Sequence, residues 1–215
     1  VVLRHKNDLD NAFNAIGRRP AILETLVPFE FEASALVVRG DDGEVMSWPP
    51  IRNEHRGGIL HLSTCPCPDL NEKTQKRIQA HAAWIAEKLE HIGTLAVEFF
   101  VIGDQVWFNE FAPRVHNSGH LTIEHSTTSQ FENHIRAVAG LPLGPTNSVH
   151  ENAIGLMMNI VGDWPDRSDL LKHTLLHVHD YGKNPRPGRK IGHVTGVFEE
   201  ASHVDDFRSR LESLH

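Results

Sequence analysis

Apolar residues follow two different periods along this chain. They recur at helical spacing in four stretches, residues 8–16, 70–92, 129–139 and 200–215. They alternate or run continuously, as in strands, in eight others: residues 21–24, 31–39, 59–63, 95–102, 106–112, 153–162, 175–182 and 190–198. The pattern predicts an α+β fold in which helices pack against an antiparallel sheet.

The two middle helical stretches each have an apolar stripe. In residues 70–92, one helix face would carry five apolar residues: Ile78, Ala82, Ile85, Leu89 and Ile92. The next begins at Ser129, which starts a capping box with Glu132. We expect this helix to pack three residues inward: Phe131, Ile135 and Val138.

A segment rich in proline, glycine and small polar residues, LPLGPTNS, follows that helix. Such composition is typical of a linker, so we predict a domain boundary near Pro142. Residues 1–142 would form the first domain. Residues 143–215 would form a small β-rich domain closed by a terminal helix.

The strongest chemical signal is a predicted β-hairpin that starts at Leu95. Its turn contains Gly103, Asp104 and Gln105. If the turn is symmetric about Asp104, residues whose numbers sum to 208 lie opposite each other, which pairs Glu98 with Glu110. By the same rule Ile102 would face Val106, and Phe100 would face Phe108.

Two carboxylates opposed on one face repel each other unless a cation lies between them. A hard divalent cation such as Mg²⁺ prefers oxygen ligands, so Glu98 and Glu110 are candidate metal ligands. The alternative is a pair of acids on the wet face of the sheet. Polar donors follow the second strand at Arg114, His116 and Asn117, which favours a functional site there.

Composition excludes several classes of protein. The net charge is −7 and no block of basic residues is present, which argues against nucleic-acid binding. No apolar run is long enough to cross a membrane, and no signal-peptide pattern occurs, so we expect a cytoplasmic protein. Cys65 and Cys67, separated by one proline, are expected to be buried, inert thiols.

Three motifs carry a resemblance to a known family: NEFAPRVHNSGHLTIE from Asn109, TSQFENHIRAVAGLPLG from Thr128 and RPGRKIGHVTG from Arg186. They resemble the 5-(carboxyamino)imidazole ribonucleotide synthases, ATP-grasp ligases of purine biosynthesis. The resemblance extends over residues 1–197. It implies an ATP-grasp fold, ATP and Mg²⁺ as cofactors, and a homodimeric carbon–nitrogen ligase that carboxylates aminoimidazole ribonucleotide with bicarbonate.

The resemblance also implies roles for individual residues. The nucleotide would contact Glu24, Thr25, Leu26, Val27, Glu32, His55, Asn109 and Glu110. Bicarbonate or carboxyphosphate would contact Arg114, His116 and Asn117, and the phosphate of the ribonucleotide would contact Arg186, Arg189 and Lys190. Considered without the resemblance, Glu24 and Glu32 are also compatible with exposed strand edges, His55 with a loop and the basic segment with a charged turn.

Two other functions remain open at this point. A related ATP-grasp ligase that uses formate would share the two acids. A non-catalytic fragment is the second possibility, because the chain contains no glycine-rich phosphate loop. The family carries that loop upstream of the position that matches Val1, so we expect this chain to be part of a longer protein.

Overall fold

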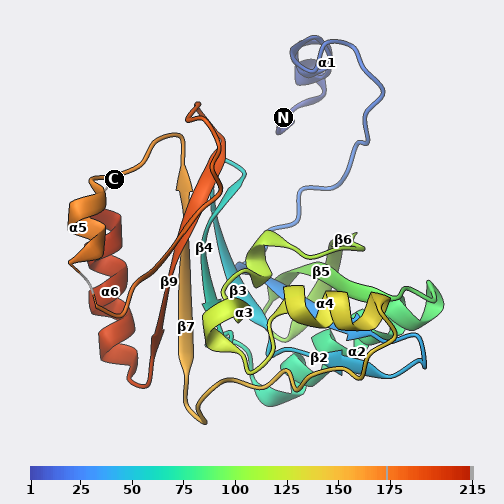
Figure 1. Cartoon of the computed structure of the whole chain (residues 1–215). Coiled ribbons are helices and arrows are strands. Elements are labelled where there is room, and N and C mark those ends of the chain that lie inside the picture. Colours follow the sequence, from blue (N-terminus) through green and yellow to red (C-terminus); the bar gives the residue numbers. More distant parts are fainter. Residues whose placement is uncertain (173, 214–215) are drawn as a thin grey trace.

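A computed structural model describes residues 1–172 and 174–213 (Figure 1). In this part of the chain, one sheet contains nine strands, in the order β6-β5-β1-β3-β4-β7-β9-β8, with β2 paired to β1. The strands are β1 Phe31–Arg39, β2 Val45–Ser47, β3 Ile51–Arg56, β4 Ile59–Cys65, β5 Gly93–Ile102, β6 Gln105–Ala112, β7 Ile154–Val161, β8 His177–Asp180 and β9 Lys190–Phe198. All neighbouring pairs are antiparallel, which confirms the predicted fold class.

Helices lie along both faces of this sheet (Figure 1). The helices on the sheet are α2 Glu72–Lys88, η2 Asn117–Gly119, α3 Thr122–His125, α4 Gln130–Val138, α5 Arg167–Leu171 and α6 Ala201–Ser213. Two further helices, η1 Lys6–Asp8 and α1 Leu9–Ala15, precede β1 in the chain. The predicted terminal helix is therefore present up to Ser213, and its last two positions lie outside the described residues.

One face, which we call the α2/α6 face, has two apolar regions, one under α2 and one under α6, with Arg52 and Glu54 of β3 between them. Side chains alternate along a strand, so Ala35 and Val37 of β1 point to this face and pack with Ile78 of α2. Farther along the sheet, Met158 and Val194 pack with residues of α6. These clusters form two of the three hydrophobic cores.

The opposite face, the α3/α4 face, has an apolar and a polar part. Leu36, Ile51 and Met157 form its core together with Leu121 and other residues. Polar residues continue the same rows of the sheet, because each pairs across the strands with a neighbour on this face. They include Glu32, Ser34, Asn53, Ser63, Glu98 and Asn159.

The first 30 residues differ from the prediction. Helix α1 confirms the helical stretch at residues 8–16, but it lies away from the sheet (Figure 1). Residues 21–24 do not form a strand. Ile22 and Leu23 are exposed, and no other strand pairs with them, so the short apolar run has no ladder to join.

A second correction concerns the β3–β4 hairpin. The alternative that His55 belongs to a loop is wrong, because His55 lies within β3. Gly57 and Gly58 form the turn, and both have positive φ angles, which glycine adopts readily. After Ile51, every residue of β3 is polar or charged, so a search for apolar runs did not identify the strand.

The helix faces also required correction. In α4 the structure buries Gln130, Asn133 and Ala137, while Ile135 and Val138 are 61% and 54% exposed. Both buried amides hydrogen-bond to the main chain, which compensates the cost of their burial. The predicted cap is correct, because the Ser129 side chain accepts a hydrogen bond from the Glu132 amide. In the earlier helix, α2 ends before Leu89, and both Leu89 and Ile92 are exposed.

The later strands and the thiols agree with the predictions. Strands β7, β8 and β9 occupy the three predicted stretches, and β7 pairs with β4, so the sheet is continuous across the proposed boundary near Pro142, which stays a prediction. Cys65 and Cys67 are buried and unpaired, and burial raises the pKa of both thiols, that of Cys67 to about 11. Within the described residues, no helix is long and apolar enough to span a bilayer.

Candidate active site

The β5–β6 hairpin brings Glu98 and Glu110 opposite each other, as predicted, but by a different register near the turn. Ile102 pairs with Gln105 and Phe99 pairs with Phe108, so the predicted symmetric turn is wrong. A β-bulge between these pairs and the acids adds one residue, Asn109, to β6. Without the bulge, Asn109 would lie opposite Glu98.

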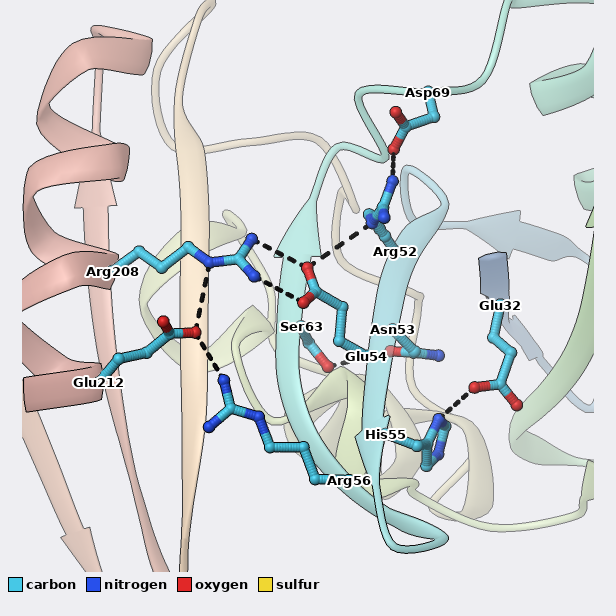
Figure 2. A network of polar contacts seen from close by, with 10 residues as sticks. All are labelled: Glu32, Arg52, Asn53, Glu54, His55, Arg56, Ser63, Asp69, Arg208 and Glu212. Atoms are coloured by element: carbon cyan, nitrogen blue, oxygen red, sulfur yellow. Dashed lines mark hydrogen bonds and ion pairs between the residues drawn. The ribbon is translucent and has the colours of Figure 1, made fainter. Parts of the chain in front are cut away.

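Other polar side chains surround this pair on the α3/α4 face. Ser34 of β1 lies beside Glu98 in the sheet. Glu32, two residues earlier on β1, hydrogen-bonds to Nδ1 of His55 (Figure 2). The Asn53 amide donates to Ser34 Oγ at 2.5 Å, so the strands are also joined by side-chain contacts.

The carboxyl group of Glu98 is largely shielded from solvent. Burial raises its pKa, the charges of Glu110 and Glu32 raise it further, and His55 and Lys190 oppose the shift. The cluster therefore combines carboxylate oxygens with a shortage of compensating positive charge. This is the donor set that Mg²⁺ takes. In the described residues no group of three or more acidic, histidine or cysteine side chains could hold a metal, so further ligands would be water or phosphate oxygens.

The loop after β6 brings His116 to the same cluster. Its Nε2 lies 3.5 Å from Glu98 Oε1, and its Nδ1 lies 2.9 Å from Ser118 Oγ. Burial, together with the positive charges of Arg114 and Lys190, lowers the pKa of His116 to about 4, so the ring is neutral at pH 7. Arg114 is exposed and donates to the carbonyl oxygen of Val115.

Sequence analysis missed the buried amide of Gln130, which holds this loop. Its Oε1 accepts from the His116 amide at 2.9 Å, and its Nε2 donates to the His116 carbonyl at 2.7 Å. These main-chain partners fix which end of the side chain is nitrogen. Nε2 of Gln130 also lies 3.0 Å from Nδ1 of His120. The Nδ1 atom of His120 is therefore an acceptor, and the ring proton of His120 is on its own Nε2.

The predicted adenine segment lies in a cavity at the edge of this site. The cavity has a volume of about 430 Å³ and is lined by the segment from Glu24 to Val27, by Phe100 and Phe108 of the hairpin, and by Asn109. Phe29 stacks on Phe100, with ring centroids 4.5 Å apart. The structure thus brings the predicted residues Glu24, Thr25, Leu26, Val27 and Asn109 together, and apolar ring faces beside polar edges suit a nucleobase.

The predicted phosphate group divides into two parts. Lys190 begins β9, and a register shift beside Val161 puts it on the α3/α4 face, where burial lowers its pKa and the charge of Glu98 opposes the shift. Arg186 is exposed on the preceding loop, and Arg189 donates to the Asn184 carbonyl at 3.4 Å. The structure therefore groups Lys190 with the acids and leaves the two arginines on the loop.

Asn117, the third predicted anion-binding residue, contacts a strand that the prediction did not connect with the site. Its amide forms two hydrogen bonds with the amide of Asn159 on β7. A polar residue inside the apolar run MMNIV was the available signal for Asn159.

Comparison with known proteins matches the two parts of the chain separately. Residues 1–131 match the family model of the ATP-grasp domain. Residues 155–206 match the model of the phosphoribosylaminoimidazole carboxylase C-terminal domain.

Individual relatives agree with these matches. The chain is 44% identical to N5-carboxyaminoimidazole ribonucleotide synthase of Pseudomonas aeruginosa, in an alignment that covers 90% of this chain and 52% of that protein. It spans about half the length of the curated relatives it matches.

Solved structures are also similar. The synthetase from Thermus thermophilus superposes with a TM-score of 0.93 at 46% identity, covering 100% of this chain and 59% of that one. The synthase from Aspergillus clavatus, crystallised with ADP and 5-aminoimidazole ribonucleotide, has a TM-score of 0.86 at 27% identity and covers 97% of this chain and 58% of that one. Because the ATP-grasp model alone matches residues 1–131 of 215, this chain belongs to the ATP-grasp family.

Proposed function

We propose that the chain forms part of an N5-carboxyaminoimidazole ribonucleotide synthase, a ligase that carboxylates aminoimidazole ribonucleotide with ATP and bicarbonate in purine biosynthesis. The observation that carries this proposal is the pairing of Glu98 with Glu110 beside the loop that holds His116. The two family models and the named relatives support the same activity.

In this proposal the nucleotide occupies the cavity beside the hairpin. The segment Glu24–Val27 contacts the adenine, and Glu32, held by His55, binds the ribose hydroxyls. Asn109 contacts the nucleotide from the bulge of β6. The bulge aims Asn109 and Glu110 at the site from adjacent positions.

Glu98 and Glu110 would hold Mg²⁺, which when bound neutralises charge on the β- and γ-phosphate oxygens. Burial, and to a lesser extent the charge of Glu110, raises the pKa of Glu98, and this supports the assignment because a cation between the two carboxylates would favour the ionised form. Both acids need to be ionised for this role, and the cation favours that state.

Arg114, His116 and Asn117 would bind bicarbonate. A bicarbonate oxygen attacks the γ-phosphorus, the bond from phosphorus to the bridging oxygen breaks, and ADP leaves with that electron pair. The resulting carboxyphosphate is attacked at carbon by the amine of the ribonucleotide, which loses a proton as inorganic phosphate departs. Arg114 stabilises the charge on the transferred group, and the neutral ring of His116 contributes a hydrogen bond to the anion.

Arg186, Arg189 and Lys190 would bind the phosphate of the ribonucleotide. The position of Lys190 beside Glu98 also allows it to contact the reacting anion, whereas the arginines on the loop are free to bind the more distant phosphate. From the family resemblance, we also propose a cytoplasmic homodimer.

The test is a substrate requirement, measured in a full-length ligase that contains this chain. ADP release should require both bicarbonate and aminoimidazole ribonucleotide at full rate. Formate in place of bicarbonate should not support it. ADP release with formate alone would assign the chain to the formate-dependent ligases, and no release with either would contradict a catalytic role.

A further inference from the structure

The side chain of Asn159 is a buried amide in an otherwise apolar strand. Only 1% of the residue is exposed, and it points to the α3/α4 face, where it meets η2. A buried amide must find hydrogen-bond partners or destabilise the fold. Asn159 has one partner on β4, Leu60, and one in the loop after β6, Asn117.

The main chain fixes the orientation of this amide. Nδ2 of Asn159 lies 3.0 Å from the carbonyl oxygen of Leu60, which can only accept. Nδ2 therefore faces β4, and its second hydrogen points to Oδ1 of Asn117 at 2.8 Å. Oδ1 of Asn159 accepts from Nδ2 of Asn117 at 2.9 Å.

The two hydrogen bonds with Asn159 use only part of the hydrogen-bonding capacity of the Asn117 side chain. Its amide has two donors and an acceptor oxygen with two lone pairs, and the pair uses one donor and one lone pair. One N–H and one lone pair are left for a ligand. Asn117 as a whole is only partly buried, which is compatible with a ligand at these groups.

We propose that Asn159 is a positioning residue for the carboxylation: it fixes the orientation of the Asn117 amide, so that the free N–H of Asn117 is presented to the bicarbonate or carboxyphosphate anion. The inference rests on the proposed function of the site. It also joins the two matched segments, because Asn117 belongs to the ATP-grasp domain and Asn159 to the C-terminal domain. Strand β7 thus contributes to anion recognition without contacting the anion.

The first experiment compares Asn159→Ala with a matched control in the full-length ligase. Asn133→Ala removes another fully buried amide, which bonds only to the main chain of Gly144 at 2.9 and 2.8 Å. Both variants should lower the melting temperature. Only Asn159→Ala should reduce kcat/KM for bicarbonate, by about 10- to 100-fold, while KM for ATP stays within about twofold of wild type.

The second experiment is a double-mutant cycle with Asn117→Ala. If Asn159 acts through Asn117, the double variant should lose no more bicarbonate kcat/KM than Asn117→Ala alone. Multiplied losses, or equal kinetic losses in Asn159→Ala and Asn133→Ala, would overturn the inference. If Asn117→Ala itself left the bicarbonate kinetics unchanged, the proposed anion site would fail and this inference with it. A loss in Asn117→Ala without one in Asn159→Ala would overturn the inference alone.

Discussion

The two faces of the sheet use the same strands for opposite purposes. On β1, Ala33, Ala35 and Val37 point to the α2/α6 face and pack into an apolar core. Their neighbours Glu32 and Ser34 point to the α3/α4 face, beside the partly buried acid Glu98. The first face stabilises the fold by burying apolar surface, while the second retains polar groups whose burial is unfavourable. This difference is expected if the polar part of the α3/α4 face is the proposed site.

Register shifts accompany the polar groups. The sheet has three, next to Glu98, His55 and Val161. Two of them decide which side chain reaches the site: one places Glu110 opposite Glu98, and another turns Lys190 toward the α3/α4 face. An unbroken ladder would have directed Lys190 to the apolar face.

The largest effect is expected from Glu98→Gln in the full-length ligase. ATP turnover should fall by about 10²- to 10³-fold, because a ligand of the proposed cation is lost. Thermal stability should rise at neutral pH, since burial and neighbouring carboxylates raise the pKa of Glu98 and so make its ionised form costly in the folded state. Steady-state kinetics and calorimetry measure the two effects. Unchanged turnover, or a marked loss of stability, would contradict the assignment.

On the apolar face, Ile78→Ala should have the reverse profile. Ile78 is fully buried, so the variant should lose about 2–5 kcal/mol of unfolding free energy in urea titrations. Substrate KM values should remain those of wild type. Ile135→Ala is the matched control on an exposed helix position and should cost less than about 0.5 kcal/mol. An equal loss of unfolding free energy in both variants would contradict the burial of Ile78 and the exposure of Ile135.

Acidification should lower the free energy of unfolding, because several histidines on the α3/α4 face are buried in their neutral form. Burial lowers the pKa of His116 and His120 to about 4 and that of His193 to about 3, from an ordinary value of 6.5. Between pH 6.5 and about 4 the unfolded chain binds more protons, so stability falls as pH falls, by up to roughly 1.4 kcal/mol per pH unit for each ring.

Unfolding free energy as a function of pH measures this slope. His193→Gln should flatten the slope, whereas His203→Gln, which alters an exposed residue, should leave it unchanged. Parallel curves for wild type and His193→Gln would show that burial of this ring does not contribute.

The smallest effect is expected where the terminal helix contacts β3. Arg208 forms two hydrogen bonds with the carboxylate of Glu54, at 3.0 and 2.6 Å (Figure 2). The Arg208 side chain is 37% exposed, so Arg208→Ala should cost only about 1 kcal/mol. Arg210→Ala, in a more exposed pair with Asp206, should cost less. Indistinguishable melting temperatures for the two variants would contradict a role for the bidentate contact.

The sequence predicted the acids more accurately than the geometry around them. Glu98 and Glu110 pair as expected because the wrong turn and the unforeseen bulge compensate each other in residue count. A bulge depends on contacts across the sheet, which apolar periodicity does not encode. Strand β3 is not predicted because nearly all of its residues are polar or charged. The predicted buried face of α4 is wrong because the buried amides of this helix find main-chain partners.

The same limitation explains why the positioning residues escaped prediction. Gln130 and Asn159 act through hydrogen bonds to groups 14 and 42 residues away along the chain. Motif spacing indicates which residues can contact a substrate, but it does not show which residues hold them. Long-range contacts supply that information only after the fold is known.

The most direct test of the account is binding of Mn²⁺, as a paramagnetic substitute for Mg²⁺, to the full-length ligase in the presence of ATP. Electron paramagnetic resonance of free Mn²⁺ gives the affinity independently of turnover. The account predicts that Glu98→Gln and Glu110→Gln each weaken Mn²⁺ binding at least tenfold, while Asn133→Ala does not. Wild-type affinity in both glutamine variants would contradict the claim that this opposed pair of carboxylates holds the cation.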